Sequence, residues 1–222
     1  MRTSKQVRGI LDGLREAYPL ADCTLDYNQA WELMVGVRLA AQCTDERVNK
    51  VIPALFERWP TAADMAAAEP EDVEPYVRSC GFYRAKARDI VNAARMLVRD
   101  YNGIVPDSMQ ELLKLPGVGR KSANLILGDV YHVPGSVVVD THCIRITNRL
   151  GLVDGLKEPE KIEYALREIL PPDECNDFCH RIVFHGRAVC MARSPKCSEC
   201  PVKNYCLTWE NMQAEKGSAD VS

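Results

Sequence analysis

Apolar residues recur at intervals of three and four along almost the whole chain, which is the spacing of one face of an α-helix. Alternation of apolar and polar residues is scarce, and the only strand-like run is SVVV at 136–139. Sharp turn signals such as Asn102-Gly103 and Pro116-Gly117 separate the helical stretches. We therefore predict an all-α protein in which 136–139 is an extended approach to a helix and not a strand.

The periodicity also predicts where the helices lie. They are expected at 5–18, 28–41, 45–58, 61–67, 70–78, 85–101, 108–113, 121–131, 141–150, 159–170 and 176–189. The polar residues from Met212 onward are expected to form a loose tail. No run reaches the ~18 apolar residues of a membrane span, and the charged first twenty residues lack the apolar core of a secretory signal. A cytoplasmic protein of one large domain or two small ones is expected from its 222 residues.

The chain has ten cysteines, which is many for a reducing compartment where clustered thiols usually bind metal. Near the C-terminus the pattern C-x6-C-x2-C-x5-C is formed by Cys190, Cys197, Cys200 and Cys206. Four thiolates so close together need a cationic partner, because like charges repel. Zinc and a [4Fe–4S] cluster are the candidates, and the wide gaps around a single close pair favour the larger cluster. The other six cysteines are expected in the core.

Charge alone neither requires nor excludes a nucleic-acid partner. The net charge is −3 and the pI is about 5.9, which is acidic for a protein that binds DNA. The charges are segregated, however, with basic residues in excess at 78–149 and 180–206 and acidic ones at 57–74 and 154–177. Such a chain can present a basic face despite its total. Residues beside the first cysteine, including His185 and Arg187, are expected either to balance an anionic cluster or to contact phosphate.

The string LPGVGRK at 115–121 joins two helical stretches through a glycine turn. Glycines leave backbone N–H groups uncovered, and the positive end of the following helix adds to them. A candidate phosphate-binding site is therefore formed by Leu115, Gly117, Val118, Gly119 and Arg120. A plain helix connector is the alternative, which the length of the string disfavours.

Lys121 stands in the first turn of the second of these helices, where the helix dipole opposes a positive charge. A partly desolvated amine in that position gives up its proton more easily, and a neutral amine attacks sugar or carbonyl carbons to form a Schiff base. The alternative is a lysine that only pairs with phosphate. Asp140 precedes another helix after an apolar run. It is either an N-cap or a carboxylate that takes a proton or stabilises a developing cation on a sugar.

Several motifs, in their order along the chain, resemble those of the endonuclease III family: LAAQCTDERVNK, LPGVGRKSAN, VVVDTHCIRITNRLG, HGR and the cysteine pattern. The resemblance covers the chain from Lys5 to about Trp209. It implies a base-excision repair enzyme of the helix-hairpin-helix superfamily that is both a DNA glycosylase and an abasic-site (AP) lyase. It also implies two helical domains with a DNA-binding cleft between them. One is a six-helix domain at 23–135, and the other, from 1–22 and 136–222, holds the [4Fe–4S] cluster.

Carried over by position, the resemblance makes Lys121 the nucleophile that attacks C1′ of the sugar and Asp140 the carboxylate that assists it. The implied substrate is double-stranded DNA with an oxidised pyrimidine that is flipped out, or with an AP site, cut by β-elimination. Gln42 matches a residue that fills the gap left by the flipped nucleotide. Phe82 matches an intercalating position that is often leucine, which leaves the opposite-base preference open. The alternative interpretation of Gln42 is a capping amide, and that of Phe82 is a core aromatic.

Three further residues lie in matching motifs, namely Asp45, His142 and Arg187. His142 and Arg187 are expected to contact DNA, although Asp45 and His142 could equally make structural hydrogen bonds. One rival function is an adenine or mismatch glycosylase without lyase activity, which Lys121 disfavours because adenine glycosylases with a similar hairpin lack this lysine. The other rival is a non-catalytic iron–sulfur or zinc DNA-binding protein. Nothing in the sequence indicates an oligomer, so a monomer is expected.

Overall fold

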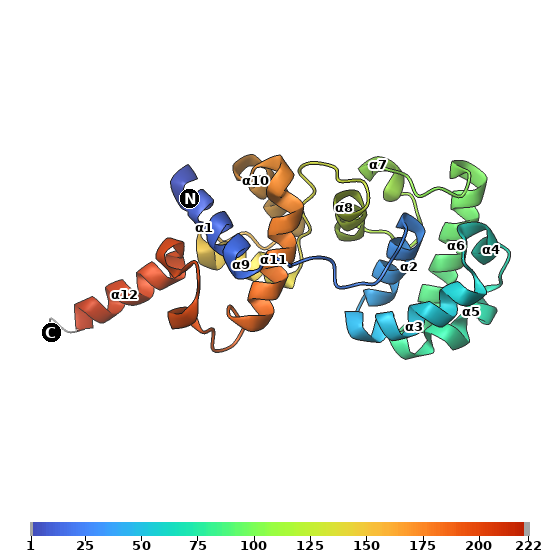
Figure 1. Cartoon of the computed structure of the whole chain (residues 1–222), viewed down its shortest axis with the longest axis horizontal. Helices are drawn as coiled ribbons and strands as arrows, with labels where there is room; N and C mark the ends of the chain where they lie inside the picture. The colour runs from blue at the N-terminus through green and yellow to red at the C-terminus, as the bar shows by residue number, and fades with distance from the viewer. Residues whose placement is uncertain (1, 220–222) are drawn as a thin grey trace. The chain divides into compact units, whose positions relative to one another are not determined.

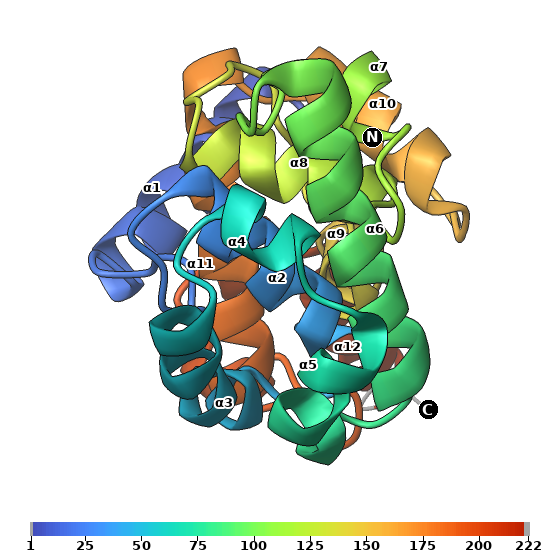
Figure 2. The ribbon, with the colours of Figure 1, turned by 90° about the vertical axis from the view of Figure 1, so that its right-hand side faces the viewer.

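The computed structural model describes residues 2–219 of the chain, with the side chains of 2–215. The described chain is helical and contains no β-strand (Figures 1 and 2). Its α-helices are α1 (Ser4–Ala17), α2 (Ala30–Ala40), α3 (Asp45–Arg58), α4 (Ala62–Ala66), α5 (Pro70–Val77), α6 (Tyr83–Tyr101), α7 (Met109–Leu112), α8 (Arg120–Asp129), α9 (Thr141–Leu150), α10 (Pro159–Ile169), α11 (Cys175–Ala188) and α12 (Leu207–Ala219). Short 3-10 turns are η1 (Arg78–Cys80), η2 (Pro172–Glu174), η3 (Cys197–Glu199) and η4 (Lys203–Tyr205). Residues 136–139 are not a strand, as predicted.

Each predicted helix is present with its ends displaced by two residues at most, because capping residues mark the ends in the sequence. Thr3 caps α1 by accepting a bond from the Gln6 N–H, and the Gln6 side chain accepts from the Thr3 N–H in return. Pro70 and Pro159 open α5 and α10, where the missing N–H of proline has no cost. Gly151 ends α9 with a φ of +78°, a value that favours glycine.

The helix α12 was not predicted, since a loose tail was expected from Met212 onward. Good helix formers fill 212–216, but they show no apolar face that would mark a helix in the sequence. The start of α12 lies against α9 and η4, and its later part runs away from the other helices of its unit (Figure 1). Within the described residues, no helix combines the length and the apolar character needed to cross a membrane.

The chain divides into two compact units, Cys23–Val133 and Met1–Asp22 with Pro134–Ser222. Each unit has a hydrophobic core of its own. The first unit contains α2 to α8, the seven helices that the periodicity predicts there, whereas the resemblance implied six; α7 is only four residues long. The second contains α1 and α9 to α12.

The boundary between the units lies two residues before the expected one at 135/136. Gly135 belongs with the second unit because its N–H donates to the Pro172 carbonyl at 2.9 Å. Its own carbonyl accepts from Arg167 Nε at 2.7 Å. These two bonds fix the chain at Gly135 before it enters the extended stretch that leads to α9.

Helix α1 approaches η4 closely at Gly9. A Cβ atom added to Gly9 would lie 2.4 Å from the ring of Tyr205, which real Cβ contacts do not reach. Gly36, inside α2, has room in comparison, since a Cβ there would meet Leu25 Cδ1 at an ordinary 3.7 Å. The two glycines therefore differ in what they contribute to packing.

We expect Gly9→Ala to lower the free energy of unfolding by ~1–3 kcal/mol, because the Tyr205 ring must be displaced. The matched control is Gly36→Ala, expected to stabilise by up to ~1 kcal/mol because alanine is the better helix former. Thermal unfolding of the two variants and the wild type measures both effects. A Gly9→Ala variant as stable as Gly36→Ala would contradict the close packing of α1 on η4.

Candidate functional site

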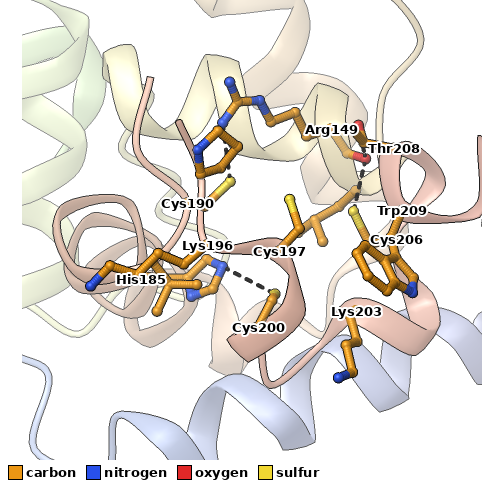
Figure 3. Close-up of a pocket in the computed structure, with 13 residues that line it drawn as sticks. Arg149, His185, Cys190, Lys196, Cys197, Cys200, Lys203, Cys206, Thr208 and Trp209 are labelled. Carbon is orange, nitrogen blue, oxygen red and sulfur yellow. Dashed lines mark hydrogen bonds between the residues drawn. The ribbon is translucent and has the colours of Figure 1, made fainter. Parts of the chain in front are cut away.

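Four cysteines converge on one pocket in the second unit, as Figure 3 shows. The pocket has an empty volume of about 410 Å³, part of which is open to solvent, and it is lined by Cys190, Cys197, Cys200 and Cys206 together with residues of α9, α11 and α12. The short turns η3 and η4 place the cysteines, since η3 begins at Cys197 and Cys206 directly follows η4. All four side chains are half-buried.

Two arginines of α9 hold the first part of the cysteine loop. The Arg149 guanidinium donates to the carbonyls of Met191 at 2.7 Å and Ala192 at 3.0 Å, and lies 3.4 Å from Cys190 Sγ. Arg145 Nε donates to the Cys190 carbonyl at 3.2 Å. The two cations thus fasten the loop through its backbone and bring positive charge next to one of the sulfurs.

His185 of α11 lines the pocket beside Cys200 and is held from behind by Tyr18, the residue that follows α1. His185 Nε2 lies 3.7 Å from Cys200 Sγ, and its Nδ1 shares a hydrogen bond of 3.0 Å with the Tyr18 hydroxyl. Burial lowers the pKa of His185 to about 4, so the ring is neutral at neutral pH. The positive charge expected from His185 beside the loop is therefore absent, and Arg149 supplies it in its place.

This set of donors fits an iron–sulfur cluster. Burial raises the pKa of Cys200 to about 11 and also raises that of Cys206, so their thiolates need bound cationic iron. The Arg149 N–H directed at Cys190 Sγ and apolar neighbours such as Trp209 are typical of the protein around such clusters.

A glycine turn joins α7 to α8 in the first unit. Gly117 has a φ of +79°, and a Cβ there would meet Arg38 Cδ at 2.6 Å, so both the backbone and the packing require glycine. Gly119 is the N-cap of α8, with a φ of −100° and no atom within 4 Å of an added Cβ. Nothing within the protein requires glycine at 119. An open backbone at a helix N-terminus is a place where an anion binds.

The five residues predicted to bind phosphate differ in their exposure. The side chains of Leu115 and Val118 are buried, and the Val118 N–H donates to the Leu115 carbonyl at 3.1 Å. These two residues anchor the turn from inside. Gly117 and Gly119 are exposed and Arg120 is half-buried, so these three form its outer side.

An ion pair that the sequence did not reveal lies beneath this turn. Arg38 of α2 donates to Asp89 Oδ2 of α6 through Nε at 2.9 Å and Nη2 at 2.6 Å. Both side chains are about one-fifth exposed, and Gly117 rests on the stem of Arg38. Since 51 positions separate the partners, no local pattern could have indicated the pair.

Lys121 is the second residue of α8, so the prediction that it stands in a first helical turn is confirmed. Its side chain is exposed, however, and not partly desolvated as expected. Any desolvation of this amine must come from a bound partner.

Asp140 is the N-cap of α9, where its Oδ1 accepts from the Cys143 N–H at 2.8 Å. The residue is half-buried. The N-cap interpretation is therefore correct. A carboxylate has two oxygens, and the cap engages one of them.

Gln42 and Phe82 share an unusual backbone conformation, with φ values of 55° and 45°. Phe82 precedes α6 and is 70% exposed, so a core aromatic is the wrong interpretation for it. Gln42 follows the end of α2 and is also exposed. Both residues stand at the surface of the first unit.

Asp45 and His142 make structural hydrogen bonds. Asp45 Oδ2 accepts from the Thr24 hydroxyl at 2.6 Å, and His142 Nδ1 lies 3.1 Å from Arg145 Nη2. Arg187 lies in the last turn of α11 and is exposed.

The sequence matches two protein families. Residues 35–172 match the HhH-GPD superfamily of base excision DNA repair proteins, and residues 190–206 match the iron–sulfur binding domain of endonuclease III. Endonuclease III of Synechocystis sp. is 45% identical over 193 residues, which are 87% of this chain and 88% of the relative. The chain belongs to the endonuclease III family. Endonuclease III of Bacillus subtilis is 38% identical over 206 residues, 93% of this chain and 94% of the relative.

Solved structures agree with this assignment. The structure described as a trapped endonuclease III–DNA covalent intermediate matches with a TM-score of 0.88 and 41% identity, over 96% of this chain and 100% of that one. As a member of the endonuclease III family, the chain is a DNA glycosylase with AP lyase activity, and it binds DNA. It carries a [4Fe–4S] cluster, so the zinc alternative is wrong, as are the two rival functions.

We expect Cys200→Ser to reduce the bound iron and acid-labile sulfide, because the hydroxyl of serine is a poor replacement for a thiolate ligand. Cys23→Ser is the matched control, since Cys23 is also half-buried but lies in the other unit. Iron and sulfide assays and the visible absorption of the purified proteins measure the effect. Full iron content in Cys200→Ser would exclude Cys200 as a ligand.

Proposed function

We propose that this member of the endonuclease III family removes oxidised pyrimidines from double-stranded DNA and cuts the strand at the resulting AP site by β-elimination. The observation that carries the proposal is the position of Lys121, an exposed amine in the first turn of α8 directly after the open turn at Gly117 and Gly119. A phosphate bound at the N-terminus of α8 would fix the neighbouring sugar within reach of that amine.

In the proposed reaction, Nζ of Lys121 attacks C1′ of the flipped nucleotide and the base leaves with the electrons of the glycosidic bond. The sugar ring opens as the Schiff base forms between Nζ and C1′. Loss of a proton from C2′ then expels the 3′ phosphate, and water finally releases the lysine. The solved endonuclease III relative that was trapped as a covalent intermediate with DNA supports covalent chemistry of this kind.

We assign Asp140 the role of the carboxylate that accepts the proton of the amine and stabilises the cationic sugar. Its cap on α9 supports this role, because the bond from the Cys143 N–H holds one oxygen in place. Gln42 would fill the gap left by the flipped nucleotide, and Phe82 would enter the base stack as an apolar wedge.

The remaining assignments concern the partner and the cluster. His142 and Arg187 are proposed to contact the DNA backbone, and we propose Cys190, Cys197, Cys200 and Cys206 as the ligands of the [4Fe–4S] cluster. The cluster would hold the loop that Arg145 and Arg149 fasten to α9. We propose a monomer that acts on DNA in the cytoplasm, at the bacterial nucleoid.

The nucleophile is tested by borohydride trapping on a duplex with one thymine glycol or AP site. The wild type is expected to give a covalent protein–DNA adduct, because borohydride reduces the Schiff base to a stable amine. Lys121→Ala is expected to give none, and strand cleavage should fall by at least ~10²-fold.

Lys114→Ala is the matched control for this experiment. Lys114 is an exposed lysine of the same hairpin and pairs with Glu111 at 2.7 Å. This variant should form the adduct as the wild type does. A trapped adduct with Lys121→Ala, or none with the iron-loaded wild type, would refute the assignment of Lys121.

The charge of Asp140 is separated from its capping role by a pair of variants. Asp140→Asn keeps an oxygen that caps α9, so its stability should change little, whereas Asp140→Ala should lose ~1 kcal/mol. Both should lose at least ~10-fold in single-turnover base release, because neither has the carboxylate. If Asp140→Asn retained full activity, the residue would be a cap and nothing more.

A further inference from the structure

The backbone is strained where Gln42 and Phe82 reach the surface. Their φ values of 55° and 45° lie in the left-handed region, which side chains other than that of glycine rarely adopt. Such conformations persist only where the surrounding structure fixes them. Each of the two residues comes two positions after the end of a helical segment, since α2 ends at Ala40 and η1 ends at Cys80.

One buried side chain joins these two helix ends. Lys86 of α6 is 1% exposed, and its Nζ donates to the Leu39 carbonyl at 2.8 Å and to the Cys80 carbonyl. Leu39 stands three residues before Gln42, and Cys80 stands two before Phe82. The ammonium group therefore holds the backbone of both segments two or three residues before the strained residue of each.

Stability alone does not explain a lysine at this position. Burial lowers the pKa of Lys86, because the ammonium group loses its hydration. Lys86 also lies in the first turn of α6, whose dipole opposes a positive charge. The carbonyl ends of α2 and η1 compensate part of this cost. An apolar side chain would fill the space without the cost, but it would not bond to the two carbonyls.

We propose that Lys86 is a positioning residue that holds Gln42 and Phe82 in the conformations with which they enter damaged DNA. The proposal rests on the proposed function, which assigns those two residues their contacts with DNA. Lys86 is too deeply buried to touch DNA itself. Its helix α6 also carries Asp89, the partner of Arg38 beneath the glycine turn. One helix therefore supports all three segments of the first unit that we assign to DNA.

The two hydrogen bonds of Lys86 to the Leu39 and Cys80 carbonyls form the Lys86 bridge. This bridge is tested first without DNA, by hydrogen exchange of the iron-loaded protein. In Lys86→Met, the amides of 40–44 and 79–84 should exchange at least ~10-fold faster, because two charge-assisted hydrogen bonds are lost. Leu97→Ala is the matched control, since Leu97 is also fully buried on α6 but lies about three helical turns further along. It should not accelerate exchange in these two segments selectively. Lys86→Gln keeps an N–H donor and should restore part of the protection.

The consequence for DNA is tested by a double-mutant cycle between Lys86 and Phe82. Binding to a thymine glycol duplex is measured against undamaged duplex for Phe82→Ala, Lys86→Met and the double variant. Phe82→Ala should reduce the preference for the damaged duplex. This reduction should be several-fold smaller in the Lys86→Met background than in the wild type, because Phe82 is then no longer held in place. Equal losses in both backgrounds would overturn the proposal, as would unchanged exchange at 40–44 and 79–84.

A variant that fails to fold and a failure of the proposed function can each be distinguished from a failure of this proposal. If Lys86→Met does not fold, Lys86→Gln carries both measurements, and wild-type exchange rates in that folded variant would overturn the proposal. If exchange rises but Gln42→Ala and Phe82→Ala bind damaged duplex as the wild type does, then the proposed DNA roles of those two residues are wrong. The Lys86 bridge would in that case lack the function proposed here.

Discussion

Both units depend on cationic side chains that donate to backbone carbonyls where helices and loops end. Lys86 holds the ends of α2 and η1, Arg95 donates to the carbonyl of Ala68 after α4, and Arg149 holds the cysteine loop. Carbonyls at the end of a helix lack intrahelical partners and carry partial negative charge, so a cation satisfies them and fixes the following segment. The segments fixed in this way include those that we assign to DNA and to the cluster.

This use of positive charge changes what the charge pattern of the sequence means. The basic excess at 78–149 suggested a face for DNA, yet Lys86, Arg145 and Arg149 direct their charge at the protein itself. A count of charges cannot separate a lysine on the surface from one whose stem and head are buried. The proposed DNA contact therefore depends on the exposed Lys121 and the open N-terminus of α8 more than the number of basic residues at 78–149 implied.

Sequence patterns predicted the features that depend on residues close together in the chain. Helical spacing and turn signals placed every helix except α12 to within two residues, and the four cysteines of one short segment do line one pocket. Contacts between distant positions could not be read in the same way. The Arg38–Asp89 pair and the Lys86 bridge each join helices far apart in the sequence, and neither belongs to a motif. The burial of Val118 was missed because the turn folds back on Leu115.

Helix α9 relates the cluster to the proposed chemistry. Asp140 caps its N-terminus, and Arg149, near its C-terminus, donates to the cysteine loop while its carbonyl accepts from Thr208. A helix rises 1.5 Å per residue, so the two residues are held roughly 14 Å apart on one rigid element. A cluster that keeps the loop folded thereby keeps α9 fixed and, with it, the proposed catalytic carboxylate. A structural role of the cluster is therefore sufficient to make catalysis depend on it.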